Sequence, residues 1–137
     1  MHEPTPSGGN YVCVYNKTRE RFVATHAQVA DGYFSRLVGL LGTTRRWARP
    51  GTGLWIVPSH GVHTIGMLYA LDLVFLDCDH VVVDVEERVR PFRISKVRFK
   101  ADSVLELPVH TVFRTETRVG DQLEISRVRA HDSNPST

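Results

Sequence analysis

The clearest pattern of hydrophobic and polar positions lies between residues 71 and 85. Side chains alternate between the two faces of an extended chain, so Leu71, Leu73 and Phe75 are predicted to face one side of a strand and Asp72, Val74 and Leu76 the other. Residues 77–80, Asp-Cys-Asp-His, supply a turn, and a valine-rich return strand begins at Val81. The pattern therefore predicts a β-hairpin.

Other short segments are rich in β-branched and aromatic residues, which is typical of strands. They cover residues 11–15, 21–29, 53–57, 103–107 and 122–126. One helix is predicted at about residues 32–42, because Asp31 can cap it, apolar residues recur at helical spacing, and Gly42 can end it. The predicted fold class is α+β, mostly β: a small barrel-like or rolled antiparallel sheet with one principal helix.

Length and composition favour a single domain. The chain has 137 residues, of which 42% are hydrophobic, enough for a core of ordinary size. We expect a disordered N-terminal segment at residues 1–10, one globular domain at residues 11–129 and a flexible tail at residues 130–137. The formal net charge of +2 is too small to name a partner.

The N-terminal residues contain neither an apolar run nor a positive cluster, so no signal peptide is present in this chain. No apolar run approaches the roughly 20 residues of a membrane helix. Cys13 and Cys78 are the only cysteines, and reduced thiols of this kind are typical of cytoplasmic proteins. We therefore expect a soluble protein of the cytoplasm.

Histidine and cysteine side chains are the usual zinc donors, but their spacing here does not favour a metal site. His60 and His63 would point to opposite faces of an extended segment, and Cys78 and His80 lie in the predicted hairpin turn. The sequence also lacks a phosphate-binding glycine loop, a nucleophile elbow and a His-Glu-x-x-His helix. No metal and no cofactor are predicted.

Several blocks, in order, resemble one known family. They are Val29-Ala30-Asp31 with Arg36 and Gly39–Gly42, Gly51–Trp55 through Pro58, His63–Met67 followed by Leu71–Asp77, Val104–Pro108, and Val119–Asp121. Together they resemble domain of unknown function 192, also called uncharacterised protein family 0127, in its His-Thr-x-Gly-Met subgroup. The resemblance spans roughly residues 23–125. It implies a fold and a soluble protein, but no established reaction.

Three places in the chain depart from the family pattern. Many members have an aromatic-Met-Lys-Asn stretch in place of residues 63–66 and a proline in place of Ala70. His110 stands where a glycine is usual, before Thr111, which bears on the tight turn that follows Pro108.

Asp72 is the most unusual residue of the hairpin, because a buried carboxylate must be paired or hydrogen-bonded. One interpretation is structural, with an ion pair or a backbone hydrogen bond that holds the turn between Gly66 and Leu71. The other is functional, with Asp72 as the polar anchor of a ligand pocket. The candidate ligand-binding residues are Arg36, Trp55, His63, Gly66 and Asp72.

A basic stripe runs from Arg88 to Lys100 and contains Phe92 and Phe99. Its candidate anion-binding residues are Arg90, Arg93 and Arg98, which could contact phosphates. The alternative is a solvated loop whose arginines pair with Glu86, Glu87, Asp102 and Glu106. The small net charge makes nucleic acid an unfavoured partner.

These observations favour a small non-enzymatic binding module that recognises a small molecule, a polymer or a protein through one polar pocket. An enzyme that uses His63 and Asp72 as an acid–base pair is the first alternative. A weak anion or nucleic-acid binder that uses the basic stripe is the second. The sequence leaves the ligand, the oligomeric state and the catalysis of any reaction open.

Overall fold

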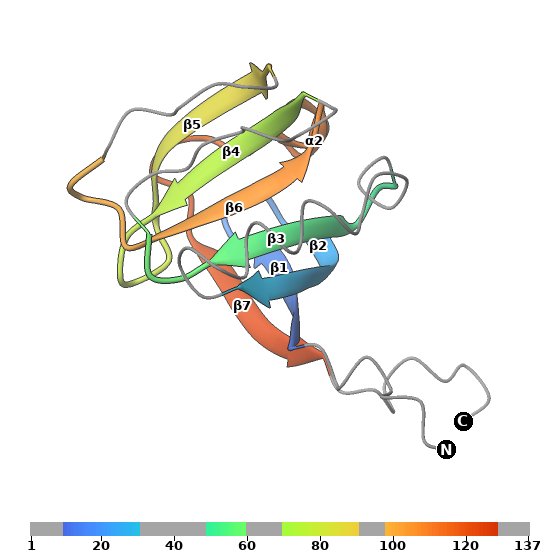
Figure 1. Ribbon diagram of the computed structural model, residues 1–137, viewed down its shortest axis with the longest axis horizontal. Helices are drawn as coiled ribbons and strands as arrows, with labels where there is room; N and C mark the ends of the chain where they lie inside the picture. Colours follow the sequence, from blue (N-terminus) through green and yellow to red (C-terminus); the bar gives the residue numbers. More distant parts are fainter. Residues whose placement is uncertain (1–9, 31–48, 60–69, 91–97, 129–137) are drawn as a thin grey trace.

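The computed structural model of the chain describes residues 10–30, 49–59, 70–90 and 98–128. These residues form seven strands and one short helix (Figure 1). The elements are β1 (Tyr11–Asn16), β2 (Arg21–Ala30), β3 (Thr52–Ile56), β4 (Leu71–Leu76), β5 (Val82–Val89), β6 (Ser103–Pro108), α2 (Thr111–Thr115) and β7 (Leu123–Val128). The helix predicted at residues 32–42 lies outside the described residues.

All seven strands belong to one rolled sheet with the order β5-β4-β6-β3-β2-β1-β7. Neighbouring strands are antiparallel except β2 and β3, which pair in parallel from His26 opposite Thr52 to Ala30 opposite Ile56. The two outer strands, β5 and β7, approach each other at their first residues, where Val81 and Gln122 form an isolated β-bridge. Over the described residues, the sheet does not close into a barrel. The prediction of a mostly β, rolled sheet is confirmed, with one parallel pair in addition.

The core lies on both faces of the sheet, and β4 contributes to both. Leu71, Leu73 and Phe75 belong to one buried cluster, whereas Val74 and Leu76 belong to the other. All six residues of β4 are buried. The predicted alternation is therefore confirmed. It places Asp72 on the face of Val74, inside the roll.

The predicted turn of the hairpin is confirmed, and Asp77 organises it. Its carboxylate Oδ1 accepts hydrogen bonds from the backbone N–H groups of Asp79 and Val81, both at 2.9 Å. His80 takes a left-handed conformation with φ of 64°, which aspartate, asparagine and histidine adopt more readily than most residues. Local side-chain bonds of this kind are why Asp is common in turns.

Helix α2 follows a tight turn in which His110 has φ of 76° and ψ of 0°. This left-handed conformation explains why a glycine is usual at the position, since a side chain there costs about 1–2 kcal/mol. The turn forms nevertheless, and the N–H of Arg114 donates to the His110 carbonyl at 2.9 Å. The Thr111 hydroxyl also donates to the Pro108 carbonyl at 2.6 Å.

A buried carboxylate joins β1 to the turn before β7. Asp121 Oδ2 accepts hydrogen bonds from Asn16 Nδ2 at 2.9 Å, Arg19 Nε at 3.1 Å and the Arg118 N–H at 2.9 Å. Burial raises the pKa of Asp121, but the bonds from Arg19, Asn16 and Arg118 outweigh it and hold the pKa below its usual value. The ionised form therefore stabilises this junction.

We expect Asp121→Asn to lower the free energy of unfolding by about 1–3 kcal/mol near pH 7. Because the folded pKa lies below the unfolded value, the contribution is complete above about pH 4 and is lost as the pH falls through the folded pKa. Urea unfolding of both proteins at several pH values measures this. The exposed Glu124→Gln serves as the control. A difference between wild type and Asp121→Asn that stays constant down to about pH 2 would contradict the prediction.

Candidate functional site

Two of the five predicted ligand-binding residues, Trp55 and Asp72, lie in the described structure, whereas Arg36, His63 and Gly66 lie outside it. In the sheet, Trp55 pairs with Leu105 of β6, and Asp72 pairs with Leu107 of the same strand. Both side chains therefore face the inside of the roll, on opposite sides of β6. Whether the five residues together form a pocket stays a prediction.

Asp72 is fully buried and bonds to two backbone amides. Its Oδ1 accepts from the Arg88 N–H and its Oδ2 from the Val112 N–H, both at 2.9 Å. A backbone hydrogen bond is the kind of contact that the structural interpretation expected, although these two partners lie on β5 and α2. One carboxylate thus joins three elements.

The sheet explains why Arg88 needs this partner. Leu71 pairs with Val89 and Leu73 with Glu86, so β5 has one more residue than β4 over this stretch. Arg88 also has a positive φ of 54°. A bulge of this kind leaves a backbone N–H outside the regular ladder of hydrogen bonds. Here that group is the Arg88 N–H, and Asp72 accepts its hydrogen bond.

Trp55 is half-buried and packs against the cluster inside the roll. Its ring meets the His80 ring edge to face, with centroids 5.5 Å apart. The indole Nε1 is buried and has no hydrogen-bond acceptor among the described residues. Buried indole N–H groups usually have one, so this atom is a donor that a ligand could use.

Of the three candidate anion-binding residues of the basic stripe, the structure describes Arg90 and Arg98, and Arg93 lies outside it. Arg98 bonds to Asp84 Oδ2 and to Glu86 Oε1, both at 2.7 Å, and lies 4.3 Å from the centre of the Phe75 ring. Burial raises the pKa of Asp84, but its bonds from Arg98 and the Val85 N–H outweigh it and lower the pKa. Arg98 thus pairs with Glu86, as the alternative interpretation expected. Anion binding by the stripe stays a prediction.

Glu106 is a second fully buried carboxylate. It pairs with Leu54 of β3 on one side and with Leu73 of β4 on the other, so it belongs to the face opposite Asp72. Buried acids therefore lie on both faces of the sheet. From the sequence, Glu106 is predicted only as a possible ion-pair partner of the arginines in the basic stripe.

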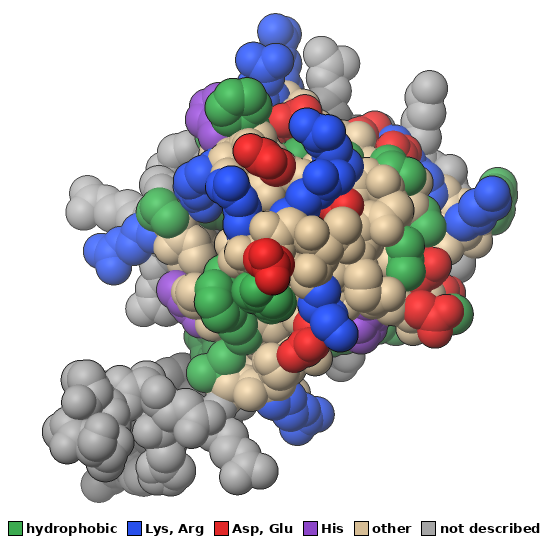
Figure 2. Space-filling view, turned by 180° about the vertical axis from the view of Figure 1, so that it is seen from behind, with side chains coloured by type: hydrophobic (Ala, Val, Ile, Leu, Met, Phe, Trp, Pro, Cys, Tyr) green, Lys and Arg blue, Asp and Glu red, His purple; other side chains and the backbone are tan. Residues whose placement is uncertain are grey.

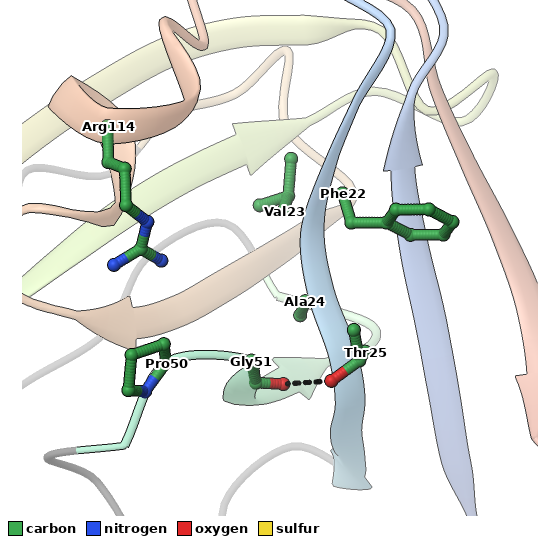
Figure 3. A pocket seen from close by; sticks show the side chains of 7 residues that line it. All are labelled: Phe22, Val23, Ala24, Thr25, Pro50, Gly51 and Arg114. Atoms are coloured by element: carbon green, nitrogen blue, oxygen red, sulfur yellow. Dashed lines mark hydrogen bonds between the residues drawn. The ribbon is translucent and has the colours of Figure 1, made fainter.

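A hollow of about 310 Å³, which the sequence does not predict, lies between β2 and α2 (Figure 3). It is lined by Phe22, Val23, Ala24, Thr25, Pro50, Gly51 and Arg114. The hollow exists because β3 begins only opposite His26, so the first half of β2 extends beyond it. We call it the β2–α2 hollow.

Gly51 closes one end of the β2–α2 hollow. Its carbonyl accepts hydrogen bonds from the N–H groups of Thr25 and His26, at 2.9 and 3.0 Å. Its φ is 91°, and a Cβ there would lie 2.5 Å from the Thr25 hydroxyl. The position therefore requires glycine.

Arg114 forms the opposite wall, and Figure 3 shows its guanidinium extending from α2 toward Pro50. The side chain is exposed, and among the described residues no acid pairs with it. Three other arginines do have acidic partners: Arg19 pairs with Asp121, Arg21 with Glu116, and Arg98 as above. Arg114 is thus a cation with room for an anion beside it.

A second hollow, of about 480 Å³, lies on the other side of Arg114. It is lined by Glu87, Val112, Phe113, Arg114, Glu116, Thr117 and Arg118. Phe113 is 79% exposed. The sequence does not single out Phe113 or Arg114, because an aromatic residue next to an arginine is ordinary in a surface segment.

Within the described ranges, no group of three or more His, Cys, Asp or Glu side chains is arranged to hold a metal ion. Nor does that part of the chain contain a helix with the length and apolarity needed to cross a membrane.

Comparison with known proteins places the chain in a family. Residues 14–125 match the model of DUF192, described as "Uncharacterized ACR". This chain belongs to the DUF192 family. Two curated UPF0127 proteins are similar to it: one from Thermococcus sibiricus, 30% identical over 80% of this chain and 71% of the relative, and one from Pyrococcus abyssi, 32% identical over 71% and 83%. Neither name assigns an activity.

Two crystal structures share the fold of this DUF192 chain. One is a candidate transcription regulator from Sinorhizobium meliloti 1021, with a TM-score of 0.68 and 25% identity over 84% of this chain and 92% of that one. The other is a protein of unknown function from Novosphingobium aromaticivorans, with a TM-score of 0.63 and 14% identity over 90% and 98%. The second likeness shows the fold alone.

We expect Asp72→Asn to lower the free energy of unfolding by about 1–3 kcal/mol, because an amide has one oxygen and would turn its NH₂ group toward a backbone donor. Urea unfolding measures the change. Asp79→Asn, at an exposed position, is the matched control and should stay within about 0.5 kcal/mol of wild type. Equal stability of the two variants would contradict the structural role of Asp72.

Proposed function

We propose that this DUF192 protein is a non-enzymatic binding module that holds an anionic group of its ligand against Arg114 in the β2–α2 hollow. The observation that carries the proposal is that Arg114 lines a hollow of about 310 Å³ and has no acidic partner among the described residues. Because the guanidinium presents paired N–H donors, a carboxylate or a phosphate group is the chemistry it fits.

The surroundings of Arg114 support an anion more than a neutral ligand. Val23 and Ala24 are buried, and Pro50 adds an apolar wall, so a ligand that enters the hollow would displace water from apolar surface beside the guanidinium. Electrostatic attraction is stronger where water is displaced. The Thr25 hydroxyl, 2.9 Å from His26 Nδ1, lies on the same hollow and is a second polar group for orienting a ligand.

The surroundings of Asp72 favour binding over the acid–base alternative. Both of its oxygens already accept a backbone N–H, and both bonds hold the fold together. A general base needs its oxygen within reach of a substrate proton. His63, the other member of the predicted pair, lies outside the described residues.

The predicted pocket around Trp55 is a second candidate for the ligand site. The specific observation is the buried indole Nε1 without an acceptor among the described residues. A ligand carbonyl or carboxylate would supply that acceptor. Binding at this place would depend on Trp55 and not on Arg114.

For the compartment, we propose the cytoplasm. Both cysteines are free, Cys13 partly buried in β1 and Cys78 exposed in the hairpin turn. An exposed thiol persists most readily where the surroundings are reducing.

The test is thermal unfolding with inorganic phosphate or succinate at constant ionic strength. If the dissociation constant of the anion is about 1 mM, then about 10 mM anion raises the free energy of unfolding by about 1.4 kcal/mol. This increase raises the Tm by a few degrees. We expect Arg114→Gln to lose this shift and the exposed control Arg127→Gln to keep it. The same shift in Arg114→Gln as in wild type would contradict the proposal. A shift lost only in Trp55→Phe would move the site to the second candidate.

A further inference from the structure

Helix α2 presents a surface larger than a single anion needs. Arg114 lines both hollows, which have volumes of about 310 and 480 Å³. Phe113, which is 79% exposed, lines the second hollow beside Arg114. The Phe22 ring, in contrast, points away from Arg114 and packs against Tyr15. We define the α2 surface as the two hollows, including Phe113.

We propose that the α2 surface binds an extended peptide segment of a partner protein, with an acidic side chain at Arg114 and an aromatic or large aliphatic side chain against Phe113. The inference rests on the proposed function, since the acidic side chain would be the anionic group held in the β2–α2 hollow. It adds the class of the ligand and the second contact.

The exposure of Phe113 supports a protein partner. Helix α2 buries Thr111, Val112 and Thr115, which leaves Phe113 and Arg114 on its exposed side. Aromatic residues and arginine are enriched in the centres of protein interfaces, where they contribute most of the binding energy.

The charges favour a peptide over a nucleic acid. The second hollow contains Glu87 and Glu116 as well as Arg118, and Arg21 lies 3.7 Å from Glu116. A nucleic acid carries a negative charge on every nucleotide and would meet these acids. A peptide can place an acidic side chain at Arg114 and a basic or neutral one beside Glu87. On the face that Figure 2 shows, acidic and basic side chains are likewise interspersed.

The strand pairing favours an extended segment. β3 begins opposite His26, so in the described structure no strand pairs with Arg21–Ala24 on the side away from β1. An extended chain can use such an edge for backbone hydrogen bonds while its side chains enter pockets. The β2–α2 hollow lies along this edge and contains Arg114.

The experiment is selection from a random dodecapeptide library displayed on phage, with the full chain as bait and Arg114→Gln as the counter-selection bait. The consensus peptide is then synthesised with a fluorescent label, and its affinity is measured by anisotropy. We expect a consensus with an acidic residue near an aromatic or large aliphatic one. Phe113→Ser and Arg114→Gln should each weaken binding about tenfold or more.

Matched controls exist in the same chain. Phe99→Ser removes an 89% exposed phenylalanine outside the α2 surface, and Arg127→Gln an exposed arginine on β7. Both should bind the peptide within about twofold of wild type. All four variants alter exposed side chains, so each should keep the Tm of wild type, which checks folding.

Three results would overturn the inference: no enriched peptide, a consensus peptide that binds both α2 variants like wild type, or tighter binding of a labelled oligothymidylate than of any peptide. If phosphate still stabilises the wild type and not Arg114→Gln, the anion site stands and only the peptide inference fails. If peptide binding depends on Phe113 and not on Arg114, the inferred acidic contact fails, and the proposed function fails as well only if phosphate stabilises Arg114→Gln as much as wild type.

Discussion

The described structure depends on one buried carboxylate, that of Asp72, which accepts a backbone N–H on each oxygen. One bond comes from the Arg88 N–H at the bulge of β5, and the other comes from the Val112 N–H and fixes the start of α2. A helix of five residues is too short to be stable by itself, so its position depends on such tertiary contacts. Arg114 lines both hollows and Phe113 lines one of them, and both residues are presented by this turn of helix, so the shape of the two hollows depends on where α2 lies.

The sequence predicts the part of the fold that depends on local pattern. The alternation over Leu71–Leu76 and the turn at Asp77 follow from side chains next to each other in the chain, and both are confirmed. The parallel pairing of β2 with β3 was not predicted, because turn length informs only about hairpins, and residues 31–51 separate these strands. Helix α2 was missed for a related reason: one turn of helix has no periodicity to detect, and its defining bond comes from a residue far away in the chain.

In the candidate site, too, the sequence predicts what depends on neighbouring residues and misses what depends on distant ones. Asp72 stood out in the sequence because a charge in an apolar strand is locally costly, and the structure shows two bonds that offset this cost. Arg114 and Phe113 gave no such signal, since an exposed arginine or phenylalanine is ordinary until its neighbours are known. His110 lies between these cases: the family resemblance marked it as a position for glycine, and its φ of 76° gives the reason.

Asp72 thus holds α2, and with it the α2 surface, against the sheet. Site-resolved amide hydrogen exchange of wild type and Asp72→Asn tests this directly, because it reports the opening of each backbone bond. If Asp72 holds α2, the Val112 amide and its neighbours in α2 exchange about tenfold faster in the variant, beyond any change shared with the amides of β6. Exchange in α2 that rises no more than exchange in β6 would contradict it.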